Sequence, residues 1–117
     1  MKKSILSLLF AIVMIPVQGQ EIYSRAFGNP KNSAVIFLHG GPGYNSSSFE
    51  ITTAETLADS GYYVIVYDRR GEGRSTASQA QFNFKETFAD LNLVFNQYQI
   101  EKATLIGHSF GGIVSTL

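Results

Sequence analysis

The chain has no cysteine and only two histidines among its 117 residues. Without cysteine it can form no disulfide framework, thiol nucleophile or cysteine-ligated metal site. It also lacks an excess of either charge, since nine basic residues balance nine acidic ones, which argues against a nucleic-acid partner. No spacing typical of metal ligands is present, so neither a metal nor another cofactor is expected. The length fits at most one small domain.

The first nineteen residues predict a secretory signal peptide that lies outside the fold. Lysines at positions 2 and 3 precede an apolar core at residues 5–15, and residues 16–19 supply a helix break and small side chains. Cleavage after Gly19 would leave residues 20–117 as an exported, periplasmic or secreted domain without stable membrane association. The alternative is a membrane anchor, but the apolar run is shorter than the roughly 20 residues that span a bilayer.

The remainder alternates apolar runs with helical patterns, as in an α/β protein whose parallel sheet is covered by helices. Strands are expected at residues 21–27, 34–38, 62–67 and 103–106. The last three are continuous apolar runs, which is typical of strands buried on both faces. The fold class predicted is therefore α/β.

Two capping boxes predict where helices begin. Ser47 with Glu50 starts a helix that ends near Gly61, and Asn83 with Glu86 starts a second one. The second helix carries apolar side chains at helical spacing, which predict one buried stripe in the core rather than a ligand surface. These residues are Phe84, Phe88, Leu91, Phe95 and Tyr98.

A G-x-S-x-G sequence follows the last strand and precedes a short helical segment. It consists of Gly107, His108, Ser109, Phe110 and Gly111. In this context the pattern is typical of the sharp turn that exposes a nucleophilic serine. The two glycines leave room for the tight turn and the close approach of strand and helix. Ser109 is therefore the predicted nucleophile; the alternative is a structural glycine turn with a solvent-exposed serine.

The sequence HGGPG at residues 39–43 directly follows a predicted buried strand. Acyl transfer needs two N–H donors for the oxyanion, one from the residue after the nucleophile and one from such a loop. We therefore expect the N–H groups of Phe110 and Gly41 to form the oxyanion hole. The supporting residues of this loop are His39, Gly40, Pro42 and Gly43.

Neither histidine is expected to be the catalytic base. His39 adjoins the oxyanion loop and is interpreted as bracing it. His108 precedes Ser109, and adjacent side chains on a tight turn point apart.

The loop at residues 68–75 is rich in glycine and arginine and follows another predicted strand. We expect Asp68 and Arg70 to form an ion pair that holds this loop; the alternative is ligand binding, because ligands of α/β proteins bind at such strand ends. A dinucleotide fingerprint is excluded because Thr76 stands where its last glycine would be.

Together these three segments resemble the amino-terminal half of an α/β-hydrolase. The HGGPG loop followed by D-x-R-G-x-G-x-S is similar to the proline iminopeptidase branch. The resemblance implies a serine hydrolase that removes an N-terminal residue from small peptides, with Ser109 as nucleophile. Asp68 and Arg70 would frame the floor of its active site.

Two departures favour an exported esterase or lipase as the alternative. Iminopeptidases usually carry glycine and tryptophan on either side of the serine, where this chain has His108 and Phe110. The signal peptide is also unlike the intracellular iminopeptidases.

In this family the lid, the acidic triad member and the histidine follow the nucleophile helix. The sequence as given is therefore expected to be the amino-terminal part of the domain, truncated after the nucleophile turn and inactive alone. Its last strand would be an open apolar edge. A further alternative is a non-catalytic product. The oligomeric state is left open.

Overall fold

The computed structural model describes residues 11–17, 20–76 and 82–117. Its strands are β1 (Ile12–Val17), β2 (Gln20–Phe27), β3 (Ser33–Leu38), β4 (Tyr62–Tyr67) and β5 (Ala103–Gly107). Its helices are α1 (Ser47–Phe49), the π-helix η1 (Glu50–Ala54), α2 (Glu55–Asp59), α3 (Phe84–Gln97) and α4 (Phe110–Val114). The expected strands are thus present, and the structure adds β1.

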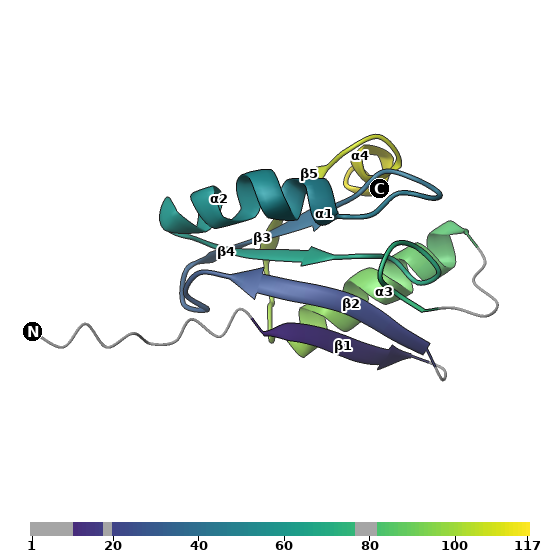
Figure 1. Ribbon diagram of the computed structural model, residues 1–117, viewed down its shortest axis with the longest axis horizontal. Helices are drawn as coiled ribbons and strands as arrows, with labels where there is room; N and C mark the ends of the chain where they lie inside the picture. The colour runs from purple at the N-terminus through teal and green to yellow at the C-terminus, as the bar shows by residue number, and fades with distance from the viewer. Residues whose placement is uncertain (1–10, 18–19, 77–81) are drawn as a thin grey trace, which may run out of the picture.

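The strands form one sheet in the order β1-β2-β4-β3-β5 (Figure 1). β3 lies parallel to both β4 and β5, which confirms the parallel sheet for these three strands. β2 is antiparallel to β4 and to β1, so the sheet as a whole is mixed. The connection from β1 to β2 is too short for a crossover, and only an antiparallel pairing accommodates it.

Two apolar clusters cover the two faces of the sheet. Along β3, Ile36 and Leu38 pack in the cluster that includes Leu91 and Val94 of α3, whereas Val35 and Phe37 join the opposite cluster with the η1 and α2 side. The alternation follows from the period of two in a strand, which makes neighbouring side chains face opposite ways. Helices therefore lie on both faces, as predicted (Figure 1).

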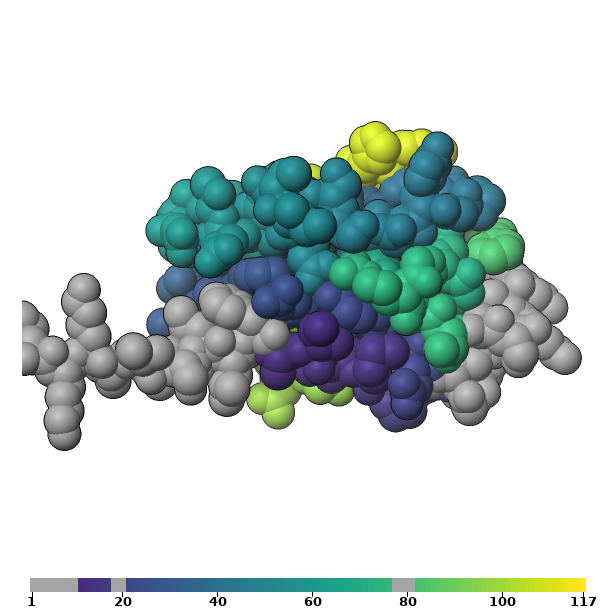
Figure 2. Space-filling view, in the orientation of Figure 1, coloured from purple at the N-terminus to yellow at the C-terminus, as the bar shows by residue number. Residues whose placement is uncertain are grey.

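β1 lies within the segment that the sequence predicts to be a signal peptide, and in this structure it pairs with β2. Ile15 is buried in the core, and Val13 and Val17 pack against it, so alternate side chains of β1 face α3. Figure 2 shows β1 and the α1–α2 surface at opposite borders of one face. Gly19 lies outside the described residues, and cleavage there stays a prediction. Within the described part of the chain, no helix is long and apolar enough to cross a membrane.

One of the two predicted capping boxes is wrong. Asn83 caps α3, with its side-chain oxygen accepting the Glu86 N–H at 2.9 Å. Glu50 instead has a buried carboxylate that accepts a hydrogen bond from the Tyr23 hydroxyl at 2.7 Å. The Ser47 hydroxyl donates to Asn45. Glu50 also forms ion pairs with Arg74 and Arg25, and these partners hold its carboxylate in place of the helix N-terminus.

The predicted aromatic stripe on α3 is only partly buried. Leu91 and Val94 lie in the core, but Phe84 is 45% exposed at the start of the helix. β5 is partly exposed as well, rather than buried on both faces, because it forms an edge of the sheet.

Candidate active site

Ser109 occupies a strained backbone position between β5 and α4. Its φ of 56° and ψ of −120° lie in a region that residues with side chains rarely adopt. The His108 N–H donates to the Leu38 carbonyl at 3.0 Å, and the Gly112 N–H donates to the Ser109 carbonyl at 2.8 Å. These bonds anchor the turn on both sides while the serine side chain stays exposed.

Close packing explains both glycines of the motif. A Cβ on Gly107 would overlap the backbone of Gly111, and a Cβ on Gly111 would overlap the carbonyl of Leu38 at the end of β3. At Gly112, by contrast, the nearest atom would be 3.6 Å away. The turn therefore excludes any side chain at the two motif positions and tolerates one at the next.

The HGGPG loop lies directly beside the turn that carries Ser109. A Cβ on Gly40 would come within 3.3 Å of the Ser109 Cβ and 3.2 Å of the His108 Nδ1. Gly41 has a φ of 143°, and the Gly41–Pro42 peptide bond is cis. Phe110 is the first residue of α4, where N–H groups have no acceptor within the helix. The structure thus brings residues 40 and 109 into contact from the ends of two neighbouring strands.

His39 is buried and both of its ring nitrogens are engaged within the loop region. Nε2 accepts the Arg69 N–H at 3.0 Å, so Nδ1 carries the proton and donates to the Gly40 carbonyl. Burial, reinforced by the charge of Arg69, lowers the pKa of His39 to about 4, which keeps the ring neutral. Among the described residues, no hydrogen bond joins Ser109 to a histidine. The geometry supports the interpretation of His39 as a brace.

The predicted Asp68–Arg70 ion pair does not form. Arg70 binds Asp90 of α3, with Nη2 at 2.6 Å from Oδ1, whereas Asp68 binds Arg74 at 2.8 Å and Ser46 at 2.7 Å. The chain leaves β4 so that these two side chains face different helices, Asp68 towards α1 and Arg70 towards α3.

Electrostatics differ between the two carboxylates. Burial favours a raised pKa at both, but hydrogen bonds from Arg74 and Ser46 outweigh it at Asp68 and hold its pKa below the usual value. At Asp90 burial dominates the hydrogen bonds from Arg70, and the pKa is raised.

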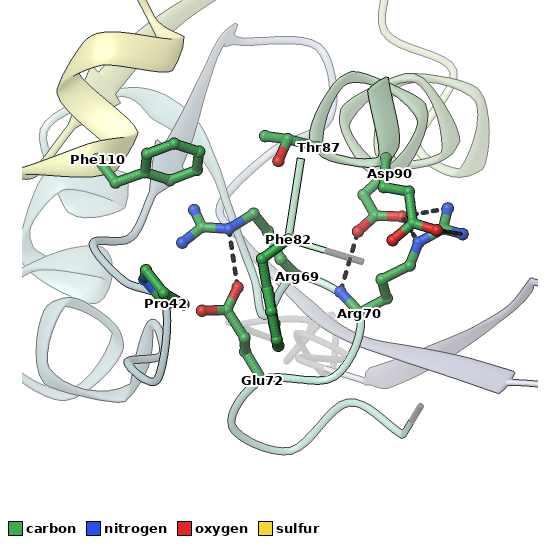
Figure 3. Close-up of a pocket in the computed structure, with 9 residues that line it drawn as sticks. Pro42, Arg69, Arg70, Glu72, Phe82, Thr87, Asp90 and Phe110 are labelled. Atoms are coloured by element: carbon green, nitrogen blue, oxygen red, sulfur yellow. Dashed lines mark hydrogen bonds and ion pairs between the residues drawn. The ribbon is translucent and has the colours of Figure 1, made fainter. Parts of the chain in front are cut away.

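Sequence reasoning missed Arg69 and Glu72, whose side chains form an ion pair in the pocket shown in Figure 3. They line a small cavity of about 50 Å³ together with Pro42 and Phe110. Arg69 and Arg70 are adjacent in a loop, and the sequence carries no pattern that shows which arginine is buried in an ion pair and which lies in solvent. Across the described ranges, no group of three or more potential metal ligands is present.

The comparisons place this geometry in a known family. Residues 33–117 match the family described as alpha/beta hydrolase fold. A non-heme chloroperoxidase of Kitasatospora aureofaciens is 36% identical over 95 residues, covering 80% of this chain and 33% of that protein. A proline iminopeptidase of Lactobacillus helveticus is 30% identical, covering 88% of this chain and 36% of the relative.

Solved structures agree with this assignment. A proline iminopeptidase-related protein of Thermus thermophilus has a TM-score of 0.78 at 31% identity, covering 91% of this chain and 38% of that structure. Esterases and epoxide hydrolases are also among the similar structures. The chain spans about a third of the length of the relatives it matches. The predicted resemblance, including that to proline iminopeptidases, is confirmed: the chain belongs to the α/β-hydrolase family.

Proposed function

We propose that Ser109 is the nucleophile of a serine hydrolase. The observation that carries this proposal is the positive φ of an exposed serine in a strand-to-helix turn. Two residues to either side of it, at positions 107 and 111, only glycine fits. Strain of this kind costs about 1–3 kcal/mol and persists where the surrounding structure imposes it. A structural turn with no chemical role would avoid that cost by carrying glycine at position 109.

The oxyanion hole of this proposal consists of the N–H groups of Gly41 and Phe110. The contact between Gly40 and Ser109 supports it, because it brings the loop to the side of the nucleophile. In the reaction Ser109 attacks a carbonyl carbon, the two N–H groups stabilise the oxyanion, and water then releases the acyl group.

A general base is the component to be identified. In this fold the carboxylate and histidine of the triad follow the serine in chain order. His39 has both ring nitrogens engaged within its own loop and is not available as that base. We propose that the base belongs to the part of the hydrolase fold that these residues do not span, since they match about a third of the length of their relatives.

The substrate we propose is a small peptide from which an N-terminal residue is removed, as in proline iminopeptidases. The HGGPG loop and the iminopeptidase relatives support this choice. An esterase is the second candidate, because His108 and Phe110 flank the serine where glycine and tryptophan are usual in iminopeptidases. We also propose export by the amino-terminal segment, and chemistry without a cofactor.

A fluorophosphonate probe tests the nucleophile. The 117-residue chain and any longer product of the same gene would each be treated with the probe, with Ser109→Ala as the control. We expect the longer product to label at Ser109 and the shorter chain not to label, because among the described residues no histidine is hydrogen-bonded to Ser109 and His39 is engaged in its own loop. Labelling that survives Ser109→Ala would overturn the assignment, and absence of labelling in both proteins would favour the non-catalytic alternative.

Substrate class follows from a second assay. Proline p-nitroanilide and a p-nitrophenyl ester would be compared by kcat/KM in the protein that labels. Preference for the anilide supports the aminopeptidase, and turnover of the ester alone supports the esterase.

A further inference from the structure

Arg69 holds the beginning of the HGGPG loop through three hydrogen bonds and forms a fourth with Glu72. It follows β4 by two residues and is buried. Its Nη1 donates to the His39 carbonyl at 2.6 Å and its Nη2 to the Gly40 carbonyl at 2.7 Å. Its backbone N–H donates to the His39 ring, and its Nε donates to Glu72 at 2.9 Å. One side chain thus holds two consecutive carbonyls of the loop.

Glu72 fastens the other end of the same loop. While its Oε2 accepts from Arg69, its Oε1 accepts the Gly43 N–H at 2.8 Å. The residue between these anchors is packed onto the pair, since a Cβ on Gly41 would lie 2.5 Å from the Glu72 Oε1 and 2.9 Å from the Arg69 Nη2. The Arg69–Glu72 ion pair therefore determines where the Gly41 peptide lies.

The same pair also contacts the residue that follows the nucleophile. The guanidinium carbon of Arg69 lies 5.0 Å from the centre of the Phe110 ring, a cation–π distance. Figure 3 shows the Arg69 guanidinium between Phe110 and Pro42, with Glu72 on the side away from Phe110. The pair thus reaches both residues that would supply oxyanion donors.

We infer that Arg69 and Glu72 are positioning residues that set the spacing between the Gly41 and Phe110 N–H groups. This inference rests on the proposed function, because it assigns the ion pair a role in that same oxyanion hole. Neither side chain needs to touch substrate. A lysine at position 69 keeps the charge but cannot hold two carbonyls and a carboxylate in one planar fork.

The test compares Arg69→Lys with Arg25→Lys in the protein that labels at Ser109. Arg25 pairs with Glu50 at 3.4 Å and stacks on Phe27, so the control makes the same substitution away from the HGGPG loop. We expect Arg69→Lys to lower kcat about 10²-fold, because displacement of a catalytic group by about 1 Å has effects of that size. KM should change less than about threefold, since the lost interaction acts in the transition state.

A transition-state analogue separates positioning from a general loss of folding. A trifluoromethyl ketone forms a serine adduct whose oxyanion occupies the hole, so its inhibition constant should rise in parallel with the fall in kcat/KM. Glu72→Gln keeps an acceptor for the Gly43 N–H but loses the charge, and a smaller loss of about tenfold is expected. Hydrogen exchange over residues 39–43 should be faster in both variants and unchanged in Arg25→Lys.

These measurements distinguish failure of the proposed function from failure of the inference about Arg69 and Glu72. If the wild-type protein shows no Ser109-dependent activity, the proposed function is overturned and this inference with it. If the wild type is active and Arg69→Lys retains its kcat and its affinity for the ketone, the inference alone is overturned. A rise in KM with unchanged kcat would also contradict it, because that result indicates substrate contact instead of positioning.

Discussion

The loops that leave the strands on either side of β3 are held in place by opposite means. The loop after β4 carries Asp68, Arg69, Arg70, Glu72 and Arg74, and each of them forms an ion pair. The loop after β5 carries no charged side chain between residues 107 and 111 and is held by backbone hydrogen bonds and glycine packing. Both loops border the same HGGPG segment. The two loops beside Ser109 are thus held in place by different means, one by charged side chains and the other by close packing against glycines.

This difference predicts how each loop responds to substitution. A loop held by packing fails where an atom is added, and a loop held by charge pairs fails where a partner is removed. The following changes test the two cases, beginning with the largest expected effect.

Gly111→Ala should be the most destabilising change, because its Cβ would overlap the Leu38 carbonyl. We expect a loss of about 4 kcal/mol or more in the free energy of unfolding, measured by urea denaturation. Gly112→Ala is the matched control: its Cβ would make ordinary van der Waals contact at 3.6 Å, and alanine favours a helix by up to about 1 kcal/mol over glycine. Equal effects of the two substitutions would refute the packing argument.

Asp68→Asn should remove about 3 kcal/mol, since the buried Asp68 carboxylate loses its ion pair with Arg74, which keeps only Glu50 as a charge partner. Chemical denaturation at neutral pH gives the value. Asp59→Asn, at an exposed position of α2, should stay within about 0.5 kcal/mol of wild type. A loss at position 68 no greater than at position 59 would show that the ion pairs do not stabilise the loop.

His39 should make stability depend on pH in the acidic range. Its folded pKa of about 4 is below the unfolded value of 6.5, so the unfolded chain binds the proton more readily. The stability contributed by neutral His39 is therefore complete above pH 6.5 and is lost as pH falls towards 4. The full loss is about 3 kcal/mol.

Unfolding measured across this range in two variants isolates the effect. His39→Gln should flatten the pH dependence, whereas His108→Asn, at the other histidine, should preserve it. If His108→Asn flattened the pH dependence of unfolding, the assignment of that dependence to His39 would be wrong.

The smallest expected effect concerns the partner of Arg70. A double-mutant cycle of Arg70→Met with Asp90→Asn should show a coupling of about 2 kcal/mol, because their side chains are in contact. The cycle of Arg70→Met with Asp68→Asn should give less than about 0.5 kcal/mol. The opposite order would restore the pairing expected from sequence.

The same contrast explains what could be predicted from sequence. Gly107 and Gly111 are required because neither position has room for a side chain. The G-x-S-x-G pattern between a predicted strand and a predicted helix is enough to predict this. The partner of Arg70 lies twenty residues away on α3, and any of several carboxylates is within reach of such a side chain on paper. The prediction of Glu50 as a capping residue was wrong for the same reason. A glutamate three residues after a serine fits a capping box, and the sequence does not show that its carboxylate is instead paired inside the protein.

The strand at residues 12–17 was missed for a different reason. An apolar run after two lysines has the composition of a signal peptide whether or not it also alternates inward and outward. The pairing with β2, from Ile12 opposite Arg25 to Val17 opposite Gln20, depends on residues outside this segment and cannot be seen in its composition.

The two edge strands of the described sheet, β1 and β5, differ in how readily another strand could pair with them. Pro16 of β1 has no N–H to offer an incoming strand, so that border resists extension. β5 has neither proline nor charge among residues 103–107 and pairs with β3 on one side only. Of the two borders of the described sheet, the β5 border therefore carries none of these features that oppose the addition of a strand, and it is the border next to Ser109.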